Sequence, residues 1–90
     1  MSIVHNNVAL VIPAYNEGSA IQATIAGIPE HFPHVIVIDD GSTDDTCARV
    51  QETRAMLVRH PINLGQGAGL QTGIDVALLD PAIDYIVTFD

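Results

Sequence analysis

The sequence has no lysine, no tryptophan, one cysteine and only four aromatic residues among its 90 residues. Its three basic residues are arginines set against eleven Asp and Glu, which gives a net charge of −8. A chain so poor in positive charge lacks the surface that neutralises nucleic-acid phosphates, and this excludes nucleic acid as a partner. The single cysteine, Cys47, excludes an intramolecular disulfide and indicates a reducing compartment.

Long apolar runs are also missing. The longest, residues 8–13, is far shorter than the roughly 20 residues of a membrane-spanning helix. The first residues combine no basic segment with an apolar run and a small-residue cleavage site, so no signal peptide is expected. Together these features predict a cytoplasmic location, which includes the surface of a membrane.

Four apolar segments of strand length alternate with three helical segments. Strands are expected at residues 7–13, 34–38, 55–60 and 85–89, and helices at 19–28, 43–53 and 65–79. Strands that are apolar on both faces and separated by helices are typical of βαβ units and a parallel sheet. The predicted fold class is therefore α/β, a three-layer Rossmann-like arrangement of about four strands and three helices.

The first two helices are expected to begin with capping boxes. Ser19 and Gln22 have the required spacing, as do Ser42 and Asp45. Asp44 and Asp45 would then lie in the first turn of the second helix, where the helix dipole favours negative charge.

Polar residues follow the predicted strands at the points where they end. Such residues share the ligand-binding edge of a parallel sheet. Asp39 and Asp40 are adjacent there, and two neighbouring carboxylates repel unless a donor or a metal compensates them. One interpretation is a solvated turn with Gly41; the other is a site that accepts hydrogen bonds from a ligand. Tyr15 either stacks on a nucleobase or covers the edge of the sheet.

Glycines open the third helix, and three of them, Gly65, Gly69 and Gly73, share one helical face. They indicate either close packing of the helix on the sheet or close approach of a diphosphate to backbone amides. A phosphate-binding P-loop is excluded because no Gly-Lys-Ser/Thr follows.

The histidines and the cysteine show no spacing typical of metal ligands. They are predicted to lie at the surface or at strand edges (His5, His31, His34 and His60) or to be a small buried apolar group (Cys47).

Four motifs in order resemble the family-two glycosyltransferases, inverting enzymes of the GT-A fold that include polyprenyl-phosphate mannosyl- and glucosyltransferases. The motifs are VIPAYNE at 11–17, VIDDGSTD at 37–44, NLGQGAG at 63–69 and YIVTFD at 85–90. The resemblance covers nearly the whole chain. It implies that residues 1–90 form the N-terminal, nucleotide-sugar-binding part of an incomplete glycosyltransferase domain.

The resemblance also implies roles for individual residues. Those expected to bind the nucleotide are Pro13, Tyr15, Glu17, Asp39, Asp40, Asn63, Gly65 and Gln66. Asp39 would read the edge of the base, and many relatives carry a lysine where this chain has Gln66. Asp90 would open the family's Asp-x-Asp motif and help to hold Mg²⁺ or Mn²⁺ against the diphosphate.

The implied reaction is metal-dependent transfer of a sugar from a UDP- or GDP-sugar to a polyprenyl-phosphate or saccharide acceptor. No catalytic residue is assigned within these 90 residues, so the chain alone is expected to bind the donor without turnover. The alternative is a non-catalytic fragment that forms homo-oligomers through the exposed edge of residues 85–89. A phosphoacceptor receiver module is disfavoured because the acidic pair follows the second strand and no lysine follows the fourth.

Overall fold

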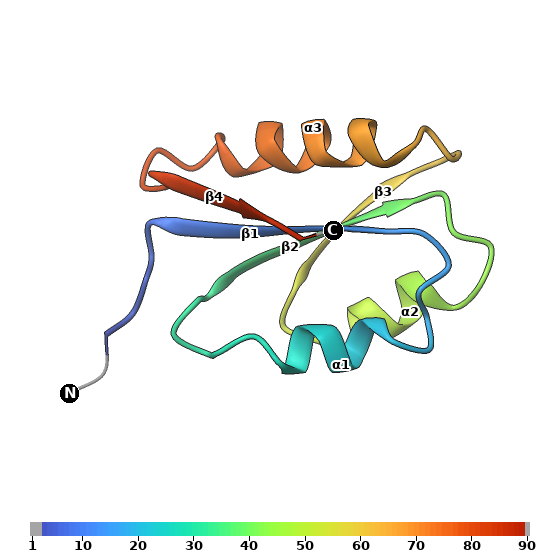
Figure 1. Ribbon diagram of the computed structural model, residues 1–90, viewed down its shortest axis with the longest axis horizontal. Helices are drawn as coiled ribbons and strands as arrows, with labels where there is room; N and C mark the ends of the chain where they lie inside the picture. Colours follow the sequence, from blue (N-terminus) through green and yellow to red (C-terminus); the bar gives the residue numbers. More distant parts are fainter. Residues whose placement is uncertain (1–2, 90) are drawn as a thin grey trace.

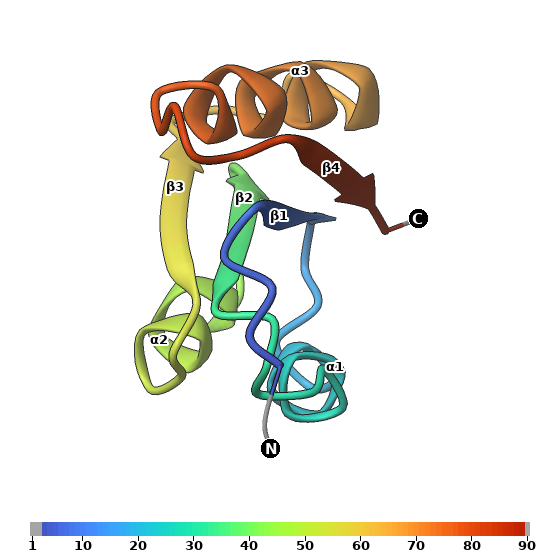
Figure 2. The same ribbon diagram turned by 90° about the vertical axis from the view of Figure 1, so that its left-hand side faces the viewer.

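The computed structural model describes residues 3–89, which form one four-stranded parallel sheet in the order β3-β2-β1-β4. The elements along the chain are β1 (Val8–Ala14), α1 (Ile21–Ala26), β2 (His34–Asp40), α2 (Thr46–Gln51), β3 (Met56–His60), α3 (Gln66–Ala77) and β4 (Tyr85–Thr88). Helix α3 covers one face of the sheet, and α1 and α2 lie against the other (Figures 1 and 2). The predicted three-layer α/β class is confirmed. No helix within residues 3–89 has the length and apolarity needed to cross a membrane.

The sheet buries a separate apolar cluster on each face. Leu10, Ile12, Val35 and Val37 pack with residues of α1 and α2, including Val50, which has no exposed surface. The intervening strand residues turn to the other face and pack beneath α3 (Ala9, Val11, Ile36 and Ile38). Because side chains alternate along a strand, the central strands β1 and β2 supply both clusters and read as uninterrupted apolar runs.

Helices α1 and α2 are shorter than predicted, and the predicted capping boxes are wrong. Helix α1 begins after Ala20 and α2 after Asp45, and neither residue makes a side-chain capping bond within the described chain. Ser42 is unavailable as a cap because its hydroxyl accepts the backbone N–H of Asn16, at 2.8 Å. A contact between two loops has therefore replaced the local capping interaction.

Glycines 69 and 73 serve close packing of α3 on the sheet, one of the two interpretations of the sequence. Both are buried in the helix. A Cβ on Gly73 would overlap Val11 Cγ1, and a Cβ on Gly69 would lie 3.4 Å from Pro13 Cβ. Helix α3 therefore approaches β1 closely because Gly73 lacks a side chain, whereas a Cβ at Gly69 would make an ordinary contact.

We predict that Gly73→Ala lowers the free energy of unfolding by about 1–3 kcal/mol, because overpacking must displace Val11 in the core. Gly67→Ala in the same helix is the matched control, since a Cβ there meets nothing within 4 Å. It should raise stability by about 0.5–1 kcal/mol through helix propensity. Urea unfolding followed by circular dichroism measures both, and equal effects of the two substitutions would contradict the packing argument.

Candidate functional site

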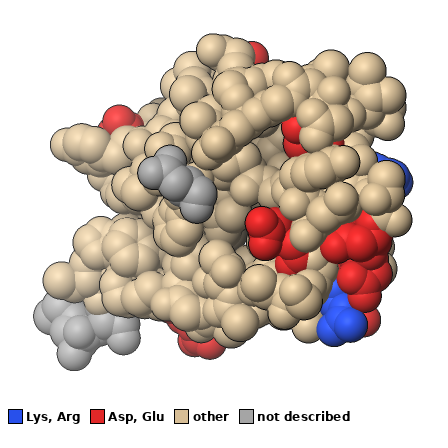
Figure 3. Space-filling model, turned by 45° about the vertical axis from the view of Figure 1, so that its right-hand side comes forward, with Lys and Arg blue, Asp and Glu red and all other residues tan. Residues whose placement is uncertain are grey.

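A cavity of about 320 Å³ opens at the carboxyl end of the sheet. Its lining residues are Pro13, Ala14, Tyr15, Glu17, Asp40, Asn63, Gly65 and Gln66. Seven of the eight residues predicted to bind nucleotide thus meet around one cavity, and Asp39 is the exception. Figure 3 shows this side of the molecule, where acidic side chains gather.

The loop after β1 is locked onto the loop after β2, and this fixes one wall of the cavity. Asn16 adopts a left-handed backbone conformation with φ of 51°, which Asn tolerates better than most residues. Its amide oxygen accepts the N–H of Thr43 at 2.9 Å, while its own N–H donates to Ser42. The neighbours of Asn16, Tyr15 and Glu17, are held at the cavity by these bonds.

Asp44 extends this lock to the start of α2. Its carboxylate accepts the backbone N–H of Gly18 at 3.1 Å and that of Thr46 at 2.9 Å, together with the Thr46 hydroxyl. The hydrogen bond from the Thr46 hydroxyl is the largest cause that keeps the pKa of Asp44 below its ordinary value. A Cβ on Gly18 would overlap Asp45 Oδ1, so the exposed side chain of Asp45 would have to move to admit one. Asp45 itself pairs with Arg49 at 2.8 Å.

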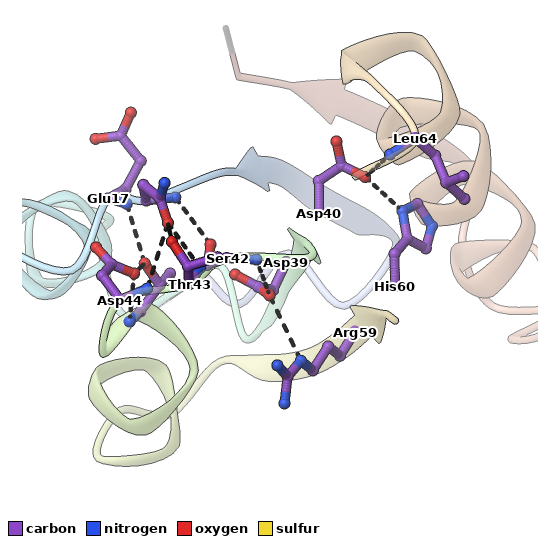
Figure 4. Close-up of polar contacts among 11 residues, drawn as sticks. Glu17, Asp39, Asp40, Ser42, Thr43, Asp44, Arg59, His60 and Leu64 are labelled. Carbon is purple, nitrogen blue, oxygen red and sulfur yellow. Dashed lines mark hydrogen bonds and ion pairs between the residues drawn. The ribbon is translucent and has the colours of Figure 1, made fainter. Parts of the chain in front are cut away.

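The opposite wall depends on Asp40. Its Oδ1 accepts the backbone N–H of Leu64 and its Oδ2 that of Gly65, both at 2.8 Å. Figure 4 shows the bond from Leu64. The two bonds hold the loop between β3 and α3, which carries Asn63 and leads into Gln66, the first residue of α3. Asp40 is only 4% exposed. Burial alone raises its pKa, but hydrogen bonds from His60, Leu64 and Gly65 outweigh burial and leave the pKa below the ordinary value.

His60 does not lie at the surface, one of the two places predicted for it; it is the last residue of β3, an edge strand of the described sheet. It is 8% exposed and its ring joins Asp40 to Thr72 of α3, with contacts of 2.9 and 2.8 Å. The sequence signal was weak because 20 residues separate His60 from Asp40. Only the pairing of β2 with β3 places the two residues opposite one another.

Asp39 faces the other side of the sheet and does not line the cavity. It has no exposed surface; its Oδ2 accepts the N–H of Ser42 at 3.1 Å and lies 3.9 Å from Arg59 Nε. Its Oδ1 is buried and has no hydrogen-bond partner among residues 3–89. Cys47 is nearby and half-buried; burial and the Asp39 carboxylate together raise the pKa of its thiol.

The predicted metal ligand Asp90 lies outside the described residues. Within residues 3–89 no three His, Cys, Asp or Glu side chains converge as a metal site would require. Both oxygens of Asp40, the buried carboxylate of the cavity, are already engaged by hydrogen bonds. The described residues therefore do not make a metal site by themselves.

The sequence profile described as Glycosyl transferase family 2 matches residues 9–90. An uncharacterized protein of Methanocaldococcus jannaschii is 38% identical over 87 residues, covering 94% of this chain and 35% of the relative. A UDP-N-acetylglucosamine–dolichyl-phosphate N-acetylglucosaminyltransferase of Methanococcus voltae is 29% identical over 99 residues, covering 90% of this chain and 39% of the relative. The chain thus spans little more than a third of the length of either relative.

Solved structures show the same fold. A glucosyl-3-phosphoglycerate synthase from Mycobacterium tuberculosis, in complex with Mn²⁺, UDP-glucose and phosphoglyceric acid, has a TM-score of 0.67 and 30% identity over 80% of this chain and 29% of its own. A mannosyltransferase from Pyrobaculum calidifontis, in complex with GDP-mannose and Mn²⁺, has a TM-score of 0.66 and 21% identity over 84% of this chain and 26% of its own. The Rossmann-like GT-A assignment of the fold is therefore confirmed.

We predict that Asp40→Asn destabilises the chain by about 2 kcal/mol at pH 7, because charge-assisted bonds to backbone amides are lost. The folded-state pKa of Asp40 lies below its ordinary value of 3.8. The stability that its ionised form contributes is therefore complete above that value and is lost as pH falls through the folded-state pKa. The difference between the two proteins should shrink below about pH 4.

Urea unfolding at pH 7, 5 and 3 measures this difference. Asp75→Asn is the control, because Asp75 is exposed on α3 and bonds only to Gln71 among the described side chains. It should change stability by less than about 0.5 kcal/mol at every pH. A cost for Asp40→Asn that stays constant down to pH 3 would show that the carboxylate charge is unimportant.

Proposed function

Because this chain belongs to glycosyl transferase family 2, we propose that it binds the nucleotide of a UDP- or GDP-sugar in the cavity at the carboxyl end of the sheet. One observation carries the proposal: seven predicted residues, from three separate segments, line a single cavity. In the whole protein this binding would serve transfer of the sugar, with inversion, to a polyprenyl-phosphate or saccharide acceptor. A lipid-linked acceptor would bring that reaction to a membrane surface.

Tyr15 is the group that we assign to the base. It is 46% exposed on the cavity wall, and the loop that follows it is fixed by the N–H groups of Asn16 and Glu17, which donate to Ser42 and Thr46. A pre-positioned aromatic ring can stack on any nucleobase without a large entropic cost. Pro13 and Glu17 form the rest of this wall.

Asp39 is proposed as the acceptor for an N–H of the base, since its buried Oδ1 lacks a partner within the described chain. A buried acceptor without a partner costs about 1–3 kcal/mol, and a base N–H would recover that free energy. Asp39 has no exposed surface and is covered by the turn at Ser42. Base contact therefore requires that turn to shift.

The diphosphate is assigned to the start of α3. The N–H groups of Leu64 and Gly65 already donate to Asp40, and the first helical bond runs from Gly69, so the amides of Gln66, Gly67 and Ala68 are left at the helix start. Asn63 adds a side-chain amide at the same wall. A divalent cation, Mg²⁺ or Mn²⁺, would supply the positive charge that this acidic chain lacks, with Asp90 as a proposed ligand.

Calorimetric titration of the chain with UDP and with GDP, each with and without Mn²⁺, tests the proposal. We predict binding of at least one nucleotide, strengthened by Mn²⁺. Tyr15→Ala should weaken it about tenfold, because base stacking on an aromatic ring is worth about 1–3 kcal/mol.

Tyr85→Ala is the matched control, since Tyr85 is 64% exposed on β4 and does not line the cavity. It should leave nucleotide affinity unchanged. Absence of heat with either nucleotide, from protein shown to be folded by circular dichroism, would exclude nucleotide binding by this chain.

A second proposal, homo-oligomer formation, is favoured by the edge strand β4. It pairs only with β1 among the described strands, and Tyr85 and Val87 are both exposed. Beneath it lies an apolar hollow of about 470 Å³, lined in part by Leu10, Phe32, Val87 and Phe89. An exposed apolar edge strand is a template for pairing with another chain.

We predict that the chain is dimeric or larger at high concentration and that Val87→Lys shifts it toward the monomer, because a charge at the edge opposes strand pairing. Met56→Lys, at an exposed position of the opposite edge strand β3, is the control and should not change the mass. Light scattering over a concentration series measures both. A monomer at every concentration would contradict the proposal.

A further inference from the structure

Both ring nitrogens of His60 are hydrogen-bonded, although His60 does not line the cavity. Nδ1 lies 2.9 Å from Asp40 Oδ1, and Nε2 lies 2.8 Å from Thr72 Oγ1. Asp40 belongs to β2, His60 to β3 and Thr72 to α3, so one imidazole joins three elements directly behind the cavity wall. Figure 4 shows the ring and the Leu64 amide approaching the same carboxylate oxygen.

The direction of the hydrogen bond follows from the carboxylate. An ionised carboxylate only accepts, so the His60 Nδ1 facing Asp40 must donate. Asp40 Oδ1 then receives two donors, His60 and Leu64, while Oδ2 receives Gly65. The amides of Leu64 and Gly65 are neighbours in the chain, and each donates to a different oxygen of Asp40. Both bonds can form only when the carboxylate has one particular torsion angle about its Cβ–Cγ bond.

We propose that His60 is a positioning residue of the nucleotide cavity: by donating from Nδ1, it fixes the rotation of the Asp40 carboxylate that holds the Leu64 and Gly65 amides. These two amides belong to the segment that carries Asn63 and Gln66 on the cavity wall. His60 thus acts on this wall through Asp40. The effect of His60 on nucleotide affinity rests on the proposed nucleotide binding, whereas its effect on the loop before α3 does not.

Two substitutions test the contacts of the two ring nitrogens of His60 separately. His60→Asn places an amide where Nδ1 stands and can still donate to Asp40, but it does not reach Thr72. His60→Gln extends its amide toward the position of Nε2 and can reach Thr72, but it offers Asp40 no donor at Nδ1. Both remove the imidazole from a buried position, so a role in packing alone predicts similar effects.

The first measurement is amide hydrogen exchange at Leu64 and Gly65, followed by NMR without nucleotide. We expect exchange within about twofold of the wild-type rate in His60→Asn and at least about tenfold faster in His60→Gln, since a bond to a charged group is worth about that factor or more. His34→Gln, at the other end of β2, is the control and should leave both amides protected. Equal exchange in the two His60 variants would overturn the proposal.

The second measurement is calorimetric affinity for UDP and GDP with Mn²⁺, which should fall in the same order, least in His60→Asn and most in His60→Gln. If the wild-type chain binds neither nucleotide, the proposed function fails while the exchange data still decide the role of His60. If His60→Gln does not fold, His60→Asn decides alone: protection near the wild-type level supports positioning, and a tenfold loss contradicts it.

Discussion

The buried carboxylate of Asp40 is the interaction on which the carboxyl end of the sheet depends. Removing a charge from water is costly, and here hydrogen bonds from His60, Leu64 and Gly65 compensate that cost. One side chain thereby connects the end of β2, the end of β3 and the start of α3. The two carboxylate oxygens of Asp40 thus hold the backbone of the loop before α3, which has no regular secondary structure.

The alternation of side chains along β2 gives its two terminal acids different surroundings. Asp40 points to the face of α3 and accepts hydrogen bonds from His60, Leu64 and Gly65. Asp39 points to the face of α2 and keeps one oxygen without a partner in the described chain. The two negative charges are thus separated by the sheet backbone. Asp40 holds the loop before α3, whereas Asp39 is buried with no exposed surface and holds the turn at Ser42.

The sequence predicted those features that depend on local pattern. The apolar runs located all four strands, and Gly69 and Gly73 indicated close packing of α3, because periodicity and glycine content are properties of the segment itself. The predicted start of α1 was wrong, since α1 begins after Ala20 without a side-chain cap. The predicted start of α2 was wrong too, because the Ser42 hydroxyl accepts a hydrogen bond from Asn16, a partner 26 residues away. His60 was missed for the same reason, since its role exists only once β2 and β3 are paired. Asp39 and Asp40 were predicted to lie in the same site because they are adjacent in the chain. In a strand, however, adjacent side chains point to opposite faces of the sheet.

The acidity of the chain constrains how an anionic donor could be held. The net charge is −8 and no lysine is present, so attraction to a diphosphate has to come from backbone dipoles or from a cation. The hydrogen bonds to Asp40 matter here. Because its carboxylate is already bonded to two amides, it presents fewer free lone pairs to repel a phosphate. Asp40 also uses the Leu64 and Gly65 amides, which leaves those of Gln66, Gly67 and Ala68 at the positive end of α3. The bonds that stabilise the loop therefore also determine which amides can face a ligand.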